Sequence, residues 1–285
     1  MVSFENKIFS QVYWKESLDK REKLRTNQEI KLAGIEKGQK VLDLRCGPGL
    51  KSKIISRRVE DTGEVICINE NKFFIEQAKN FCRDCNNIKF IYGDVLDSIK
   101  LIKRHYGKNK KFDHIIFSWI HISPGDQLKL MRNVSKLLTK KGILTISRGG
   151  DNLRHPFSKL FNERLQENLY KIFKMEYPGL NTKLLLKLRY NINKAKIDII
   201  DSFQDTIKLV KNSGFKVRQI KEVIQPITLK ERLELYKNPL RNKHIGNLPL
   251  KERYRLIEKA FKATIKELGN KKLQTHRYYI TFNKS

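Results

Sequence analysis

The sequence predicts an α/β fold, a doubly wound and mostly parallel sheet of seven strands that carries helical insertions. Five short apolar segments alternate with helical segments between residues 36 and 148, and a glycine-rich turn follows the first of them. Two more strand-like segments lie near the C-terminus. A chain of 285 residues is long enough to bury a sizeable core around such a sheet.

Each of the five early strands is short and apolar along its length, which is typical of strands buried on both faces. We expect them at residues 40–44, 64–68, 88–92, 113–118 and 143–147, with helices at about 5–33, 50–58, 72–83, 96–104 and 125–138. The segment Lys140-Lys141-Gly142 is expected to turn the chain into the fifth strand. Because parallel crossovers are right-handed, the alternation favours helices on both faces of the sheet.

The pattern changes after Ser147. Strands are expected only at 215–224 and 277–282, and helices at about 156–175, 182–193, 201–212, 229–237 and 250–268. Because the helical blocks interrupt the strand alternation, we interpret them as insertions around the end of the sheet. Insertions of this kind are typical material for a lid or a substrate pocket.

The chain carries a net charge of +30, from 60 basic and 30 acidic side chains. A surplus of this size is typical of proteins that bind nucleic acid or another acidic partner. However, lysine outnumbers arginine by 42 to 18 and is spread along the whole chain, a distribution that codon bias and solubility also produce. Both explanations remain open from the sequence.

Four cysteines, Cys46, Cys67, Cys82 and Cys85, do not make a secreted disulfide framework in a chain of this length. The pair Cys82 and Cys85 has no second pair at the spacing of a zinc site, so we expect two thiols near a helix end and no metal. No apolar run reaches the roughly 18 residues of a membrane span, and the N-terminus lacks a secretion pattern. We therefore expect a cytoplasmic protein without a membrane segment.

A short apolar strand from Val41 runs into a glycine-rich turn, which contains Asp43, Arg45, Cys46, Gly47, Pro48 and Gly49. Glycines let the backbone approach a ligand closely, and the next helix offers free N–H donors. The turn lacks the lysine of a P-loop and the spacing of dinucleotide-binding loops. It resembles the first motif of class I S-adenosylmethionine-dependent methyltransferases, usually an acidic residue followed by Gly-x-Gly-x-Gly. Arg45 stands where that motif has its first glycine.

Four later landmarks of the same family follow in the same order. They are Asn69-Glu70, Gly93-Asp94-Val95, the strand ending at Ser118, and the stretch from Leu130 to Ile146. The chain is therefore identified as a member of this family, and the resemblance implies a Rossmann-like core that binds S-adenosylmethionine at the loop residues Asp43 to Gly49.

The resemblance also implies roles at the ends of the next strands. Asn69 takes the place of the carboxylate that accepts hydrogen bonds from both ribose hydroxyls, although one amide oxygen is a poorer double acceptor. Glu70 replaces it if the strand ends one residue later. Asp94, with Val95, matches the acidic residue that accepts from the adenine amino group.

Three residues near the expected pocket have two interpretations each. His121 is either a general base toward the acceptor or a partly buried histidine at a strand end. Tyr13 is either a lid contact near the cofactor's carboxylate or an ordinary packing residue on the N-terminal helix. Ser118, at the end of the fourth strand, is expected to contact the cofactor. Trp119 follows it and either lies against the adenine or packs in the core.

The region after the fifth strand is loosely similar to trans-aconitate and malonyl-carrier-protein carboxyl methyltransferases. The similarity rests on a proline-containing loop at 150–156 and on the helical block that ends at 277–280. Arg148, Arg154 and His155 lie close together in this region. They are either contacts to an anionic substrate or part of a solvated loop.

Arg45 has three interpretations. It is neutral if its side chain points away and its φ stays negative. Alternatively, it pairs with the cofactor's carboxylate or an acidic substrate. Finally, together with Asn69, it marks a cofactor site that has decayed.

The interpretation we favour is a methyltransferase acting on a small-molecule acceptor, for which a carboxylic acid is one candidate. The alternatives are an RNA methyltransferase, suggested by the charge, and a non-catalytic protein that retains the fold. The expected domains are a helical lid (1–35), the cofactor-binding core (36–148), a helical substrate cap (149–200), and the end of the sheet (201–285) with a second insertion at about 227–272. The sequence does not indicate an oligomeric state.

Overall fold

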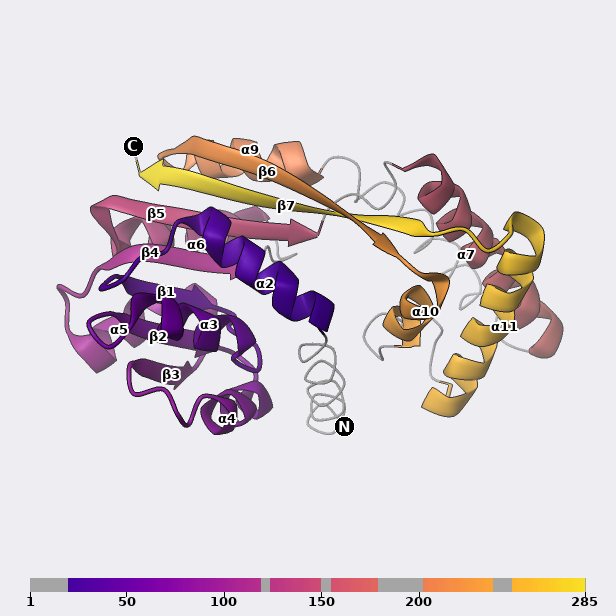
Figure 1. Ribbon diagram of the computed structural model, residues 1–285, viewed down its shortest axis with the longest axis horizontal. Helices are drawn as coiled ribbons and strands as arrows, with labels where there is room; N and C mark the ends of the chain where they lie inside the picture. The colour runs from indigo at the N-terminus through magenta and orange to yellow at the C-terminus, as the bar shows by residue number, and fades with distance from the viewer. Residues whose placement is uncertain (1–19, 119–123, 150–154, 179–201, 238–247, 285) are drawn as a thin grey trace. The chain divides into compact units, whose positions relative to one another are not determined.

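The computed structural model describes residues 20–118, 124–149, 155–178, 202–237 and 248–284 (Figure 1). It confirms the predicted α/β fold, because seven strands form one sheet in the order β3-β2-β1-β4-β5-β7-β6. The strands are β1 (Lys40–Leu44), β2 (Glu64–Asn69), β3 (Ile88–Tyr92), β4 (Phe112–Ser118), β5 (Leu138–Gly149), β6 (Phe215–Ile227) and β7 (Leu273–Lys284). The described helices are α2 (Lys20–Ala33), α3 (Leu50–Val59), α4 (Lys72–Phe81), α5 (Ser98–Tyr106), α6 (Pro124–Leu137), α7 (Pro156–Glu176), α9 (Ser202–Asn212), α10 (Leu229–Lys237) and α11 (Leu250–Leu268), with a 3₁₀ turn, η1 (Val95–Asp97).

Strand β1 lies between β2 and β4 and pairs with both in parallel. Its residues Val41, Leu42 and Leu44 have no exposed surface, which explains why the strand is apolar without alternation. The strand order reverses between β1 and β4. In open α/β sheets ligands bind outside the carboxyl ends of the strands at such a reversal, so the fold points to the end of β1.

Strand β5 differs from the prediction. The residues expected to form a turn, Lys140 to Gly142, belong to the strand. Phe112 pairs with Leu138 and His114 pairs with Ile143, so one residue of β4 lies opposite four of β5. The prediction was wrong because strand pairing on both sides of the irregularity carries the chain through it as a bulge.

The chain divides into two compact units. Unit 1 comprises residues 1–148, 205–222 and 278–285, and unit 2 comprises 149–204 and 223–277. Part of the core of unit 1 forms where Ile55 and Val59 of α3 pack with Val41 and Val65 of the sheet. Helix α2 is fixed to α3 by an ion pair of 2.7 Å between Glu29, which is 2% exposed, and Lys51. The first part of the predicted N-terminal helix lies outside the described residues, and the role of this region as a lid stays a prediction.

Unit 2 has a core of its own, built mainly by α7 and α11. The rings of Phe161 and Phe261 lie with centroids 5.5 Å apart, and both side chains are almost fully buried. Asn168 donates a hydrogen bond of 3.1 Å to the hydroxyl of Thr264 inside this core. Both predicted insertions fall within unit 2. That the unit caps a substrate stays a prediction, as do the domain boundaries.

None of the described helices is long and apolar enough to cross a membrane. This agrees with the hydropathy of the sequence, in which charged residues interrupt every apolar stretch.

His114 on β4 is a titratable side chain in the centre of unit 1. It has no exposed surface, and its Nε2 lies 2.7 Å from the hydroxyl of Thr145 on β5. Burial lowers the pKa of this imidazole to about 3, with a smaller contribution from the charge of Arg218. The ring is therefore neutral in the folded protein at neutral pH.

We predict that this histidine makes the fold sensitive to acid. The unfolded chain takes up a proton near the ordinary histidine pKa of 6.5, whereas the folded chain does so only near 3, so stability falls as the pH drops through that interval. Between pH 7.5 and pH 5, the wild type should lose about 2 kcal/mol of its free energy of unfolding through this histidine, and His114→Gln should not lose it. Urea unfolding of both proteins at several pH values measures this difference, and parallel pH curves would contradict the prediction.

Candidate functional site

The loop after β1 contains three residues with positive φ, at alternate positions. Gly47 and Gly49 have φ values of 58° and 93°, and Arg45 has a φ of 57°. A Cβ atom on Gly49 would lie 3.0 Å from the Cβ of Ala78 and 3.2 Å from the sulfur of Cys82. The loop therefore packs directly against α4, and glycine at position 49 is required both by the backbone angle and by this close approach.

The structure corrects one premise about Arg45, because its φ is positive. The left-handed conformation costs about 1–2 kcal/mol for a residue with a side chain. The turn is nevertheless retained, since the Arg45 N–H donates a hydrogen bond of 2.8 Å to the carbonyl oxygen of Ile68 on β2. The Arg45 guanidinium forms an ion pair of 2.5 Å with Glu70, with both side chains about 40% exposed. Pairing with a cofactor or substrate carboxylate stays a prediction.

Asp43, the fourth residue of β1, is buried beneath the loop and does not reach the surface. Its side chain is 1% exposed and accepts a hydrogen bond of 2.8 Å from Ser52 on α3. Burial raises the pKa of the carboxyl to about 6, against the opposing influence of Lys51 and the Ser52 hydrogen bond. At neutral pH the carboxylate is ionised and ties the start of α3 to β1.

Cysteine side chains fill the space beneath the same loop. The thiols of Cys46 and Cys82 each lie 3.6 Å from a loop carbonyl oxygen, that of Gly47 and that of Gly49 respectively. Burial raises the pKa of Cys82 to about 12, and a hydrogen bond to Cys67 together with burial raises the pKa of Cys46. These thiols remain protonated and serve as packing. Among the described residues, no group of three or more metal-type side chains could hold an ion.

Strand β2 ends at Asn69, one residue later than the sequence analysis expected. Asn69 is 3% exposed, and its side-chain oxygen accepts a hydrogen bond of 2.8 Å from the N–H of Asn71. Asn71 in turn caps α4 by accepting from the N–H groups of Phe73 and Phe74. Glu70 points outward, into its ion pair with Arg45.

The end of β3 lies next to the end of β2, since the Gly93 N–H donates to the carbonyl oxygen of Asn69 at 3.0 Å. Asp94 then begins η1 by accepting a hydrogen bond of 2.8 Å from the N–H of Leu96. Its carboxylate is exposed, whereas Val95 is buried. The structure thus brings together the predicted residues of β1, β2 and β3 at one edge of the sheet.

The structure describes only some of the site residues predicted at and after the ends of β4 and β5. Ser118 lies with its hydroxyl 3.1 Å from that of Ser147. Arg148 is only 5% exposed and donates to the hydroxyl of Thr206, so its guanidinium is held inside unit 1. His155 precedes α7 in unit 2, so its predicted convergence with Arg148 stays a prediction. The remaining predicted residues lie outside the described residues: Tyr13, Trp119, His121 and Arg154.

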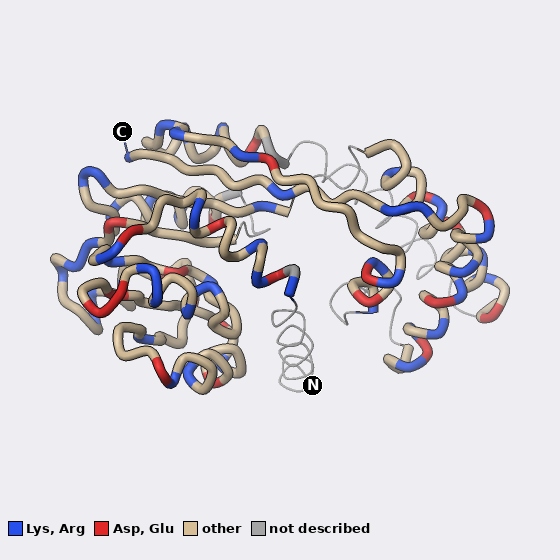
Figure 2. The backbone as a smooth tube through the Cα atoms, viewed as in Figure 1, with Lys and Arg blue, Asp and Glu red and all other residues tan. Residues whose placement is uncertain are grey.

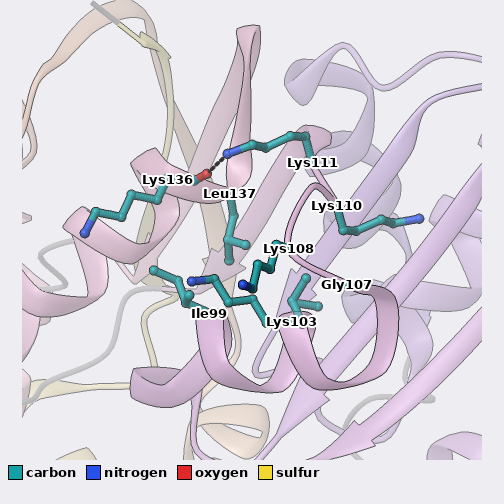
Figure 3. A pocket seen from close by; sticks show the side chains of 9 residues that line it. Ile99, Lys103, Gly107, Lys108, Lys110, Lys111, Lys136 and Leu137 are labelled. Carbon is teal, nitrogen blue, oxygen red and sulfur yellow. Dashed lines mark hydrogen bonds between the residues drawn. The ribbon is translucent and has the colours of Figure 1, made fainter.

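A pocket of about 260 Å³ lies near the amino ends of β4 and β5, at the edge opposite the glycine loop (Figure 3). Five lysines and three aliphatic side chains line it together with Gly107. Lys111 reaches across to the carbonyl oxygen of Lys136, and Lys110 pairs with Glu64. Because the strand ends that carry the motifs lie at the other edge, this pocket is not the candidate cofactor site.

The residues at the carboxyl edge fit an adenosine cofactor that carries a carboxylate. Gly49 keeps the loop free of side-chain bulk, and α3 begins without a side-chain cap, which leaves backbone N–H donors for an anion. Glu70 and Asp94 supply exposed carboxylates after β2 and β3, which suit hydroxyl and amino donors.

The sequence analysis did not identify two residues that form hydrogen bonds to the predicted site residues. Ser52, which holds Asp43, and Asn71, which links Asn69 to α4, carry no motif of their own. Asn71 could have been found from its position as an N-cap before Lys72. The contact between Ser52 and Asp43 depends on packing of α3 against β1 and has no local signal.

Comparison with known proteins places a methyltransferase domain in the part of the chain that carries these strand ends. Residues 35–176 match a family model described as a methyltransferase domain. The chain is similar to the demethylmenaquinone methyltransferase of Staphylococcus aureus (strain MRSA252), with 25% identity over 115 residues, which are 40% of this chain and 45% of that protein. The match thus spans less than half the length of this relative.

Two solved structures show a similar fold at low identity. A provisionally assigned methyltransferase from Bacillus halodurans C-125 has a TM-score of 0.54 at 11% identity, covering 90% of this chain and 97% of that chain. The geranyl diphosphate C-methyltransferase of Streptomyces coelicolor A3(2), solved with S-adenosyl-L-homocysteine, has a TM-score of 0.50 at 11% identity, covering 93% and 76%.

We predict that Gly49→Ala lowers the free energy of unfolding by more than the strain of a positive φ alone would. Gly34 is the control, because its φ of 70° is also positive but nothing lies within 4 Å of its missing Cβ. Gly34→Ala should lower the free energy of unfolding by about 1 kcal/mol, and Gly49→Ala by about 2–4 kcal/mol, since α4 must also move. Urea unfolding measures both variants, and equal losses would contradict the prediction.

Proposed function

The chain belongs to the class I S-adenosylmethionine-dependent methyltransferases, and we propose that it methylates a small-molecule acceptor. The observation that carries the cofactor assignment is the loop of Gly47 and Gly49, packed against α4 at the carboxyl end of β1. The acceptor class is supported by the demethylmenaquinone methyltransferase and the geranyl diphosphate methyltransferase, whose names both state small-molecule acceptors. Within that class we favour a carboxylic acid.

S-adenosylmethionine supplies a methyl group activated by its sulfonium. The task of the protein is then to bind, to align the acceptor with that methyl group and to exclude water. We assign binding to the loop backbone from Cys46 to Gly49, to Glu70 and to Asp94. His121 is our candidate for removing a proton from the acceptor.

Unit 2 is our candidate for the acceptor-binding part. The architecture of unit 2 supports this assignment, since it is a mainly helical unit with its own core, and its residues are inserted in the chain between strands of the sheet. Arg154 and His155 belong to it and would suit a carboxylate. The similarity to trans-aconitate and malonyl-carrier-protein methyltransferases remains part of this proposal, as does the N-terminal contact of Tyr13.

The basic charge gives little support to an RNA acceptor. Figure 2 shows lysine and arginine over helices, strands and loops of both units, with acidic residues interspersed among them. In unit 2, for example, Glu176 pairs with Arg255 and with Lys259. A nucleic-acid site is expected to gather basic residues on one face or along one element, and the five lysines that line the pocket near the amino ends of β4 and β5 lie at the edge opposite the candidate cofactor site.

We predict that the protein binds S-adenosylhomocysteine and labels small molecules but not RNA. Calorimetry measures the first part, and transfer of a labelled methyl group to a panel of small acids, prenyl diphosphates and quinols, beside total RNA, measures the second. Label in the small-molecule fraction that is insensitive to salt supports the proposal. Label in RNA that falls steeply between 50 and 200 mM salt would refute it, because phosphate binding releases counterions.

A further inference from the structure

A lysine-rich pocket of about 260 Å³ lies in unit 1, near the amino ends of β4 and β5 (Figure 3). Five of its nine described lining residues are lysines, namely Lys103, Lys108, Lys110, Lys111 and Lys136. Lysine makes up 42 of the 285 residues of the chain, so nine residues taken at random would include about one. The general abundance of lysine therefore does not explain why five of them gather here.

Two of these lysines are already bonded within the protein. Lys110 forms an ion pair with Glu64, and Lys111 donates a hydrogen bond to the main-chain carbonyl oxygen of Lys136. The side chains of Lys103, Lys108 and Lys136 have no hydrogen-bond or ion-pair partner within the described ranges of the chain. Because none of the nine described lining residues is acidic, the pocket carries a surplus of positive charge.

The ends of two helices account for part of this surplus. Lys103 lies in the last turn of α5, and Lys136 lies in the last turn of α6. A helix C-terminus carries roughly half a negative charge, so the two ends together balance about one lysine. Lys108 lies beyond the end of α5. About two positive charges are therefore left without a counterpart among the described residues.

The side chains without partners differ in where they point. Figure 3 shows the ends of Lys103 and Lys108 in the same part of the pocket, whereas Lys136 extends outward at its rim. An anion in the pocket would relieve the repulsion between the first two ammonium groups and would meet both of them at once.

The chemistry of the lining selects phosphate among anions. Lysine binds phosphate oxygens as a compact point charge. A single carboxylate brings one negative charge, whereas adjacent phosphate groups bring two or more, which matches the surplus. The four lining residues that are not lysine are Ile99, Ile102, Gly107 and Leu137, so no aromatic ring is available on which a base could stack. The volume is slightly below the roughly 300–1,000 Å³ of pockets for drug-sized ligands, which favours a compact anion.

We propose that this pocket is a second ligand site, which binds a compact polyphosphate group such as inorganic diphosphate. Lys103 and Lys108 contact the phosphate oxygens, and Lys136 adds its charge at the rim. The site lies at the edge of the sheet opposite the glycine loop, so it acts apart from methyl transfer. It rests neither on the cofactor nor on the acceptor proposed above.

The experiment is calorimetric titration of the full chain with inorganic phosphate, diphosphate and triphosphate, in magnesium-free buffer at constant ionic strength. One diphosphate should bind per chain, more tightly than phosphate. Lys103→Gln and Lys108→Gln should each weaken diphosphate binding about three-fold, and the double variant about ten-fold. Lys136→Gln should have a smaller effect, because its side chain lies at the rim.

Three lysines outside the pocket provide matched controls. Lys174, Lys211 and Lys266 are exposed and lie in the last turns of α7, α9 and α11. Glutamine at these positions removes the same charge from the same kind of helix end. These variants should bind diphosphate as tightly as wild type, and a thermal melt of every variant shows whether it folds.

Three results would overturn the proposal. The first is no saturable binding of diphosphate, and the second is several weak sites that respond equally to the pocket and control substitutions, which would be a general attraction to the net charge of +30. The third is displacement of diphosphate by S-adenosylhomocysteine, because the anion would then occupy the candidate cofactor site. Tighter binding of an RNA homopolymer through Lys103 and Lys108 would replace the compact anion by a nucleic acid and would also overturn the proposal.

Discussion

The edge of the sheet that carries the candidate cofactor site depends on the burial of β1 between β2 and β4. Because both neighbours run parallel to β1, the three strands end at the same edge, and the chain must leave β1 through a tight turn into α3. That turn has little space, since Gly49 touches α4 and cysteine thiols fill the volume below. Burial therefore fixes where the loop backbone lies, and the exposed ion pair of Arg45 and Glu70 forms on a loop whose position the core already determines.

The strands and the position of the loop could be predicted because their causes are local in the sequence. A strand covered on both faces must be apolar at successive positions, and β1 and β2 show this directly. Helix α11 begins after Pro249 and ends before Gly269, both of which are visible as sequence signals. The positions of Asp94 and Asn69 could be predicted because both residues lie at or just after the end of a strand.

The features that could not be predicted arise from contacts between distant residues. Lys140 to Gly142 have the composition of a turn, yet pairing with β4 keeps them in β5. Ser52 reaches Asp43 only because α3 packs on the sheet. The partner of Arg45 lies 25 positions further along the chain, and the sequence alone suggested cofactor or substrate anions instead of Glu70.

The conformation of Arg45 is itself an argument about its side chain. Glycine adopts positive φ without strain, as Gly47 and Gly49 do in the same loop, so an arginine backbone at φ 57° is less stable than glycine by about 1–2 kcal/mol. An exposed ion pair contributes about 0–1 kcal/mol, which does not reliably offset this cost. Glu60 also has a positive φ, but its ψ of −171° differs from the left-handed conformation that is common at helix ends. Strained residues gather at binding sites, and Arg45 lies in the glycine loop at the carboxyl end of β1, so we infer that its side chain has a role at this edge of the sheet.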